Sequence, residues 1–307
     1  MKISIIAIVL NFLYAFTLPA DAVKLEYNLK VGDVYELQQQ TNQTIKQTIM
    51  GMAQDGTSEY SGTMLMKVKS TTSDRSDLET QFLKLRNSSK TLMGENTMDS
   101  EGDQENPQNK VFKSMMNKTF TITLKKDGAI EKVSGTENLW SDVDKLGLDD
   151  ATVKAMKEAM GQFMSESSLR KSLGQSLVRY SDKKVKVGET WTSKSDFPMD
   201  FPIEINNVWK LSSHSGTTAT VDASGVYTTI DADRIVTLPG GFKAKVNLTG
   251  TQTVNAVIKD KSGWSDLTSI QSNLKGKMIL QAGGMIPTDM EIPMEIATKT
   301  SYTTVKK

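Results

Sequence analysis

The sequence contains no cysteine among its 307 residues. This absence excludes disulfides, thiolate nucleophiles, cysteine-ligated zinc and iron–sulfur clusters, and it excludes the N-terminal lipid anchor of a bacterial lipoprotein. A chain exported without disulfides must be stabilised by its hydrophobic core. The length allows one large core or two small ones, because domains commonly contain roughly 100–200 residues.

Neither sign of charge dominates the chain. It has 37 basic and 36 acidic residues, and the two signs are mixed along the sequence. No basic run or stripe is present, so the electrostatic footprint of a protein that binds nucleic acid or an anionic membrane is missing. We therefore expect no nucleic-acid partner.

Histidine is almost absent as well, since His214 is the only one. A histidine-based metal site needs at least two imidazoles and is excluded within one chain. His214 could act as a base for a neighbouring serine hydroxyl, but its Ser- and Gly-rich surroundings are typical of an exposed loop. The chain also lacks a Gly-x-Ser-x-Gly elbow and the glycine-rich loops that bind phosphate.

Paired carboxylates are the one catalytic arrangement that the sequence leaves open, because such pairs form in space rather than in sequence. Asp231 with Asp233 and Asp196 with Asp200 are the candidates. Both pairs lie beside turn or strand-end residues, where acids are common. We therefore expect a protein that is not an enzyme and has no catalytic residues, cofactor or metal. A carboxylate-based glycan hydrolase remains the alternative.

Long apolar runs occur only at the N-terminus. Met1-Lys2 is a short basic region, residues 3–18 are mostly apolar, and small residues at Ala20 and Ala22 form a cleavage pattern. Residues 1–22 are therefore interpreted as a secretory signal peptide. A membrane anchor would need roughly 20 apolar residues. We expect a periplasmic or extracellular protein that does not span the membrane after signal cleavage.

Alternating apolar and polar residues predict strands on both sides of one helical segment. Four stretches carry the alternation: residues 60–68, 120–124, 242–248 and 290–296. The predicted fold is mainly β, with long antiparallel strands in one or two curved sheets and a central helical pair. Its divisions are a β-rich half at 23–147, the helical segment at 148–180 and a second β-rich half at 181–307. Pro293 cannot donate to a strand ladder, so its strand should be an edge or bulged there.

The helical segment should contain two helices. Asp149 is a good N-cap, and Leu148 and Val153 have the spacing of a hydrophobic staple. Two apolar stripes follow, and the second is out of phase with the first. The first comprises Val153, Met156, Met160, Phe163 and Met164, and the second Leu169, Leu173 and Leu177. The phase change predicts a break near Ser167.

The acidic stretch at 95–110 is interpreted as a solvated loop ending near Pro107, because acidic sequence poor in aromatics resists burial. A calcium site is the alternative, since hard cations bind oxygen ligands. The spacing of these acids does not match an EF-hand loop.

The two β-rich halves share short motifs. Lys-Val-Gly-Asp at 30–33 and Lys-Val-Gly-Glu at 186–189 each precede an aromatic anchor, Tyr35 or Trp191. Gly62-Thr63 and the residues after it also resemble Gly250-Thr251 and its followers. Duplication and common turn chemistry both explain these matches.

With the signal peptide, the Val-Gly-Asp-x-Tyr strand resembles a family of uncharacterised secreted bacterial proteins of unknown function, of the Bacteroidetes type (DUF6263-like). This family implies no catalytic residues. The architecture is also similar to that of periplasmic lipoprotein carriers, a similarity that does not fix function.

Methionine is the most informative residue type present. Flexible, polarizable thioethers suit surfaces that accept varied apolar shapes, and several fall on predicted apolar faces. The predicted ligand-binding residues are Met64, Met66, Met156, Met160, Phe163, Met164, Met290 and Met294. The alternative is that they only fill gaps in the core. We therefore expect a binding protein for a lipid-like or other apolar small molecule. An envelope scaffold that recruits a protein partner through its strand edges is the second hypothesis.

Overall fold

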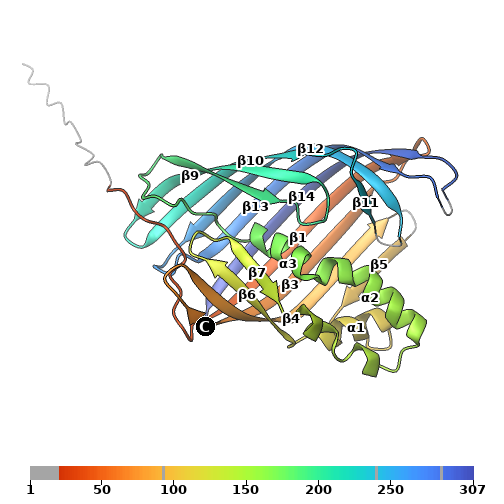
Figure 1. Ribbon diagram of the computed structural model, residues 1–307, viewed down its shortest axis with the longest axis horizontal. Coiled ribbons are helices and arrows are strands. Elements are labelled where there is room, and N and C mark those ends of the chain that lie inside the picture. The colour runs from red at the N-terminus through yellow and green to blue at the C-terminus, as the bar shows by residue number, and fades with distance from the viewer. Residues whose placement is uncertain (1–20, 92–93, 239–240, 284–285) are drawn as a thin grey trace, which may run out of the picture.

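The computed structural model describes residues 21–91, 94–238, 241–283 and 286–307 (Figure 1). The predicted signal peptide lies outside these ranges except for Asp21 and Ala22. The strands are β1 (Val34–Ile49), β2 (Met52–Ala53), β3 (Gly56–Thr71), β4 (Arg75–Thr91), β5 (Gly94–Asp99), β6 (Thr119–Lys125), β7 (Ile130–Ser134), β8 (Thr190–Asp196), β9 (Ile203–Ser215), β10 (Thr218–Thr229), β11 (Ile235–Thr237), β12 (Lys243–Ile258), β13 (Ser265–Leu280) and β14 (Met290–Lys306). The helices are α1 (Pro107–Met115), α2 (Asp150–Met164) and α3 (Glu166–Gln175), with 3-10 turns η1 (Thr136–Trp140) and η2 (Val143–Lys145).

All 14 strands belong to one antiparallel sheet with the order β7-β6-β4-β3-β1-β14-β13-β12-β10-β9-β8 along its main path. It consists of two meanders, one running from β1 to β7 and the other from β8 to β14. The meanders join where β1 pairs with β14, from Tyr35↔Lys306 to Gln47↔Met294. The prediction of a mainly β fold with long antiparallel strands is confirmed, and there is one sheet rather than two.

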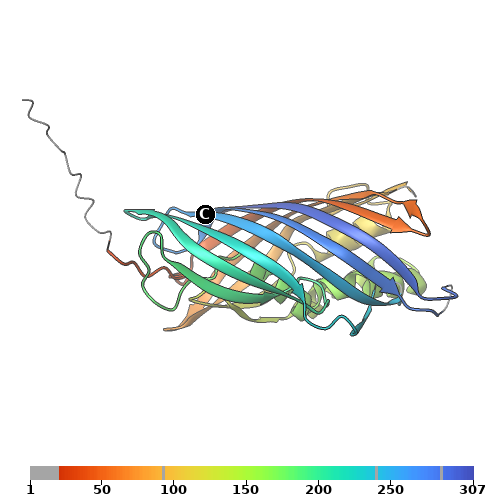
Figure 2. The ribbon, with the colours of Figure 1, turned by 90° about the horizontal axis from the view of Figure 1, so that it is seen from above.

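The sheet is strongly curved, and the helical segment crosses its concave side (Figures 1 and 2). We call this concave side of the sheet the trough. The two strands at the ends of the main path, β7 and β8, both contact α3, so the helix lies between the sheet's ends. Residues of one face are buried and those of the other are exposed along most of β12, which reproduces the predicted alternation.

A glycine on the inner face allows two strands to approach closely. A Cβ at Gly250 in β12 would lie 2.1 Å from the backbone oxygen of Asn273 in β13. Glycine within a strand often marks a site where another backbone approaches closely. The backbones of β12 and β13 can approach here because position 250 has no side chain.

One end of the trough is closed by aromatic side chains. Tyr35 stacks on Trp264 with ring centroids 4.9 Å apart, and Tyr27 meets the same indole edge-on at 5.5 Å. The Tyr180 hydroxyl donates a 2.6 Å hydrogen bond to the Gly263 carbonyl. Tyr27 belongs to the segment before β1, whose Val23 forms a backbone bridge with Val185. This segment and the aromatic cluster seal the end of the trough beside the C-terminus.

The predicted pair of helices is confirmed, with the break two residues earlier than expected. The Asp149 side chain caps α2 by accepting from the Thr152 amide at 2.9 Å. Ser165 ends α2 and caps α3, because its hydroxyl accepts from the Ser168 amide at 3.2 Å. Leu169 and Leu173 of α3 are buried, so the second stripe faces the core as predicted.

The interpretation of 95–110 as a loop is wrong in part. Its beginning forms β5, which pairs with β4, and α1 starts at Pro107 behind an Asn106 cap. The Asn109 side chain, which is buried, accepts from the Asp99 amide and donates to the Asp103 carbonyl, both at 2.8 Å. Helix propensity alone did not indicate α1. The helix is stabilised mainly by tertiary packing, because its residues Val111, Phe112 and Met115 are buried in the core.

The two Lys-Val-Gly turns have the same geometry. Gly32 and Gly188 have φ of 91° and 92°, and their amides donate to Val68 of β3 and Leu211 of β9. Each turn therefore docks on the second strand of its own meander. The other sequence match relates β3 to β12, the second strand of one meander to the fourth of the next. The two matches cannot belong to one duplication.

Pro293 lies where β14 has run past the end of β1. The β1 pairing stops at Met294, while Pro293 still faces Lys277 of β13. Its missing N–H therefore leaves no gap in the β1 ladder. β14 nevertheless lies between β1 and β13 and has no bulge at Pro293, so the prediction of an edge or bulged strand is wrong for the strand as a whole.

Candidate functional site

A cavity of about 790 Å³ lies between the trough and the helical segment. Its walls combine inner-face residues of β1, β3, β4, β10, β12, β13 and β14 with residues of α2, α3 and the loop between β8 and β9. Ligand cavities in proteins commonly measure roughly 300–1,000 Å³. The volume is therefore that of a binding site for a small molecule.

The burial pattern of the central strands shows where the core ends and the cavity begins. Tyr35 and Leu37 of β1 are buried, but the next inner-face residues, from Gln39 to Ile49, are only half-buried. Inner-face positions of a central strand would be buried if the trough were filled. Ile45, Met294 and Ile296 consequently leave apolar surface facing the cavity. Such surface favours an apolar occupant.

Most of the wall is apolar. It includes Leu248 and Leu274 from a second hydrophobic cluster on β9–β13, and Met64, Leu169 and Leu173 from the main core. The cavity therefore lies where the two clusters meet. Phe197 and Phe201 stack with ring centroids 5.8 Å apart and line it from the loop between β8 and β9.

A polar stripe runs along β1 and β14 on the floor of the cavity. The Thr41 and Thr300 hydroxyls lie 3.0 Å apart, the Gln43 amide donates to Thr298 Oγ1 at 3.2 Å, and the Gln39 amide donates to Thr41 at 3.1 Å. All five residues line the cavity. These groups largely satisfy one another, so the stripe can lie beside apolar ligand atoms at little cost.

Three tyrosines also line the cavity. Burial raises the pKa of Tyr60 to about 12 and that of Tyr227 to about 12, and it raises the pKa of Tyr302 well above its ordinary value. The hydroxyls therefore stay protonated at neutral pH. They can donate hydrogen bonds but do not serve as bases.

A buried polar layer crosses β9, β10 and β12 beside the cavity. The Tyr227 hydroxyl donates to Gln252 Oε1 at 2.6 Å, and the Gln252 amide donates to Asn207 Oδ1 at 2.8 Å. Gly225 pairs with both Asn207 and Gln252 in the sheet. The layer fixes the side chain of Gln252 at the boundary between the cavity and a second space.

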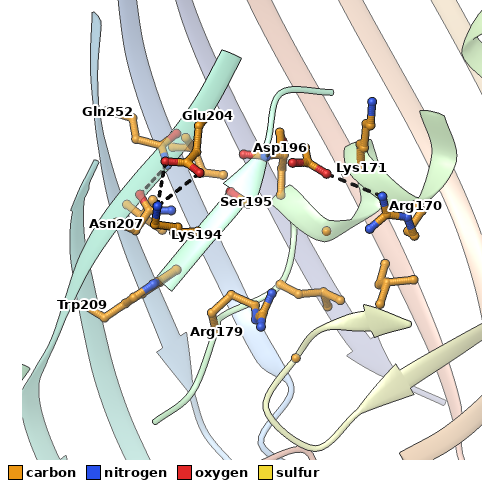
Figure 3. A pocket seen from close by; sticks show the side chains of 17 residues that line it. Arg170, Lys171, Arg179, Lys194, Ser195, Asp196, Glu204, Asn207, Trp209 and Gln252 are labelled. Carbon is orange, nitrogen blue, oxygen red and sulfur yellow. Dashed lines mark hydrogen bonds and ion pairs between the residues drawn. The ribbon is translucent and has the colours of Figure 1, made fainter. Parts of the chain in front are cut away.

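The second space, which we call the α3 pocket, has a volume of about 180 Å³ (Figure 3). Its charged lining residues are Arg170, Lys171, Arg179, Lys194, Asp196 and Glu204. Figure 3 shows Arg170 paired with Asp196, at 3.5 Å, and Lys194 paired with Glu204, at 3.1 Å. Lys171 pairs with Asp200 at 3.3 Å and Arg179 with Asp127 at 3.1 Å.

The predicted ligand-binding residues are only partly brought together. Met64, Phe163, Met164 and Met294 line the cavity. The other four do not: Met66 and Met160 are buried in the main core cluster, Met156 packs against that cluster, and Met290 pairs with Leu280 at the start of β14.

Sequence reasoning missed Met199 and Met278, which also line the cavity, and the whole polar stripe. Met278 follows an alternating pattern in β13 that could have indicated it. The residues of the stripe carry no such signal, because β1 is polar on both faces.

The carboxylates considered for catalysis are each held by cations or turn amides. Asp200 lies 2.9 Å from Arg234 and Asp233 lies 2.8 Å from Lys245. Asp231 accepts from the amides of residues 233 and 234, at 3.2 and 3.1 Å. His214 lies at the end of β9, paired with Ala219, rather than in a loop.

Within the ranges that the structure describes, no group of three or more His, Cys, Asp or Glu side chains is placed to hold a metal ion. Two of the acids of 95–109 instead meet cations, since Lys84 pairs with Glu101, and Arg86 lies 3.7 Å from Asp99. No helix in the described part of the chain is long and apolar enough to cross a membrane.

The fold and cavity define a class: a curved antiparallel sheet that encloses a mostly apolar space with the help of a central helical segment. The model of a family of unknown function (DUF6263) matches residues 73–265, more than half of the sequence, and the chain belongs to that family. The resemblance drawn from the sequence is thereby confirmed. No curated protein matches the chain.

Solved structures that resemble the chain do so only distantly. An outer membrane channel from Pseudomonas putida F1 has 9% identity and a TM-score of 0.26, with 90% of this chain and 97% of that chain covered. OccK7 of Pseudomonas aeruginosa has 6% identity and a TM-score of 0.23, covering 90% and 100%. The β domain of the Bordetella autotransporter BrkA has 8% identity and a TM-score of 0.21, covering 90% and 100%. Scores this low do not indicate a shared fold.

Proposed function

We propose that this protein is a non-catalytic binding protein of the periplasm or the extracellular space, and that its cavity holds a lipid-like or other apolar molecule. The observation that carries the proposal is the cavity of about 790 Å³, with half-buried Ile45, Met294 and Ile296 at positions where a filled trough would bury them. Burying apolar surface contributes roughly 25 cal/mol per Å². An apolar ligand would cover this surface.

The exterior of the sheet supports a carrier that works in water. The outward residues of β12, such as Lys243, Asn247, Thr249, Thr251 and Thr253, are exposed and polar. The apolar faces of the same strand point into the trough. A protein built this way can keep an apolar molecule away from water.

The two alternatives have less support. A glycan hydrolase needs two carboxylates facing a cleft, whereas Asp196, Asp200 and Asp233 are ion-paired with basic side chains. A scaffold that recruits strands needs a free edge. The strands at the two ends of the main path, β7 and β8, both contact α3, and the Gln175 amide donates to the Asp196 carbonyl of β8 at 3.3 Å.

The test begins with native mass spectrometry of the mature protein, purified without detergent, and extraction of any bound lipid. A fluorescence titration with N-phenyl-1-naphthylamine, a neutral apolar probe, then measures the affinity of the cavity. Ile296→Glu places a carboxylate in the cavity wall, and Ala297→Glu places the same group on the outer face of the same strand.

We expect Ile296→Glu to weaken probe binding at least about tenfold, because a charge is costly to bury beside an apolar ligand. Ala297→Glu should bind the probe like the unmodified protein. An apo mass together with no saturable probe binding would refute the proposal. Equal effects of the two substitutions would show that the probe binds elsewhere.

A further inference from the structure

We propose that the α3 pocket receives the anionic group, a carboxylate or a phosphate, of an amphiphile whose apolar chain occupies the cavity. This inference rests on the proposed function and specifies its ligand class. Three side chains, Gln175, Gln252 and Ile270, line both spaces. The two spaces are therefore adjacent, and an amphiphile that occupies both would pass between these side chains.

The charge of the pocket favours an anion. Its lining holds four basic side chains and two acidic ones. The acids that pair with Lys171 and Arg179, namely Asp200 and Asp127, lie outside the lining, and their side chains are 74% and 41% exposed. Exposed ion pairs are weak. An anion in the pocket would meet the basic groups without facing these two acids directly.

Arg179 has donors that no protein group uses. Its Nη2 donates to Asp127 at 3.1 Å, and its Nε is buried without an acceptor. A guanidinium carries five N–H donors in a planar fork that matches carboxylate and phosphate oxygens. The Arg179 side chain lines the α3 pocket, so an anion in the pocket would lie beside its positive charge. Figure 3 shows Arg179 beside the space between β8 and the end of α3.

The size of the two spaces fits a ligand of this kind. A single water molecule needs roughly 10–15 Å³, so the α3 pocket, at about 180 Å³, has room for a carboxylate or a phosphate group. The larger cavity accepts the chain. A neutral amphiphile would bring no charge to the basic side chains of the α3 pocket and should bind less tightly.

The experiment compares three ligands with the same chain: dodecanoate, dodecyl phosphate and dodecanol, each used below its aggregation threshold. They compete with N-phenyl-1-naphthylamine for the mature full-length protein, for Arg179→Gln and for Arg75→Gln. Arg75 is the matched control, because it forms a 3.1 Å ion pair with Glu131 and does not line the α3 pocket. Inorganic phosphate is titrated separately.

We expect both anions to displace the probe at concentrations at least about tenfold lower than dodecanol, since hydrogen bonds to charged groups are the strong ones. Arg75→Gln should keep this preference. Arg179→Gln should abolish it and leave the dodecanol affinity unchanged. High salt should reduce the preference in the unmodified protein.

The possible failures are distinguishable. If the probe binds but the anions compete no better than dodecanol, or if Arg179→Gln keeps the preference, the inference is wrong and the proposed function stands. If inorganic phosphate binds as tightly as dodecyl phosphate, the pocket is a free-anion site and the amphiphile is excluded. If the probe does not bind at all, the proposed function fails and the inference fails with it.

Discussion

The side-chain amide of Gln252 donates a 2.8 Å hydrogen bond to Asn207 Oδ1, and the residue paired with both of them is Gly225. A Cβ at Gly225 would lie 2.2 Å from that Asn207 oxygen and 2.7 Å from Gln252 Cγ. The hydrogen bond therefore exists because position 225 has no side chain. Since Tyr227 donates to Gln252 as well, the whole polar layer beside the cavity depends on this glycine.

Gly225→Ala should destabilise the protein by about 2–3 kcal/mol, because it separates two buried polar groups that then lack partners. Urea unfolding followed by tryptophan fluorescence measures the change. Gly161→Ala in α2 is the control. A Cβ there meets nothing within 4 Å, so the change should stabilise the helix by roughly 0.5–1 kcal/mol. Equal stability of Gly225→Ala and the unmodified protein would show that the layer can rearrange freely.

Alkaline pH should reveal the buried tyrosines. Burial raises the pKa of Tyr60 to about 12, from an ordinary value of about 10. A raised pKa stabilises the fold fully below the unfolded value, and this contribution is lost as the pH rises through the folded value. Tyr60→Phe removes the ionisable group. The variant should therefore lose roughly 2 kcal/mol less stability than the unmodified protein between pH 10 and 12.

Tyr227→Phe is the matched comparison. Within the described ranges the Tyr60 hydroxyl has no hydrogen-bond partner, whereas the Tyr227 hydroxyl donates to Gln252 Oε1 at 2.6 Å. At pH 7 Tyr60→Phe should change the free energy of unfolding little, and Tyr227→Phe should lower it by roughly 1–3 kcal/mol. Similar losses for the two variants at pH 7 would contradict the assignment of these hydrogen bonds.

Local rules in the sequence predicted much of the secondary structure. The Asp149 cap, the phase change after Met164 and the alternation in β12 each reflect interactions between residues close in sequence. These local interactions predict the same secondary structure whatever the rest of the chain is. The mainly β fold with a central helical pair follows from them.

The site was less predictable, because it depends on which strands become neighbours. β1 is polar on both faces, so its sequence does not show that Gln39, Thr41 and Gln43 face the cavity. Only the pairing of β1 with β14, the first strand with the last, places them there. The same holds for the α3 pocket, because Arg179 and Gln252 both line it although they lie far apart in the sequence. Half of the residues that the methionine pattern predicted as ligand-binding do line the cavity. The pattern could not distinguish residues of the cavity from residues of the core.

Acid should weaken the ion pair between Lys118, just before β6, and Asp142, just before η2. Hydrogen bonds from Lys118 and Lys145 lower the pKa of Asp142 to about 2. A lowered pKa stabilises the fold above the unfolded value of about 4, and this contribution is lost as the pH falls through the folded value. Asp142→Asn should therefore be less stable at pH 7 and show a smaller further loss between pH 4 and pH 2.

The measurement for Asp142→Asn is the thermal unfolding midpoint at intervals from pH 7 to pH 2. Asp55→Asn is the control, since Asp55 is an exposed acid between β2 and β3 with no ion pair within the described ranges. It should follow the unmodified protein throughout. An Asp142→Asn curve parallel to that of the unmodified protein would show that Lys118 and Lys145 do not hold this carboxylate in solution.

Two tyrosine hydroxyls at the closed end of the trough, those of Tyr27 and Tyr35, should contribute unequally to the free energy of unfolding. Tyr27 Oη accepts from the buried Val178 amide at 3.1 Å and so ties the segment before β1 to the segment after α3. Tyr27→Phe leaves that amide without an acceptor and should cost roughly 1–3 kcal/mol.

Tyr35 donates to Asp33 at 3.2 Å, but Asp33 also accepts from Lys306 at 2.8 Å. Tyr35→Phe keeps the ring stacked on Trp264 and should cost less than Tyr27→Phe. Urea unfolding of both variants measures the difference, and hydrogen exchange at the Val178 amide should accelerate only in Tyr27→Phe. Unchanged protection of that amide would mean that burial alone, without the tyrosine oxygen, keeps it from water.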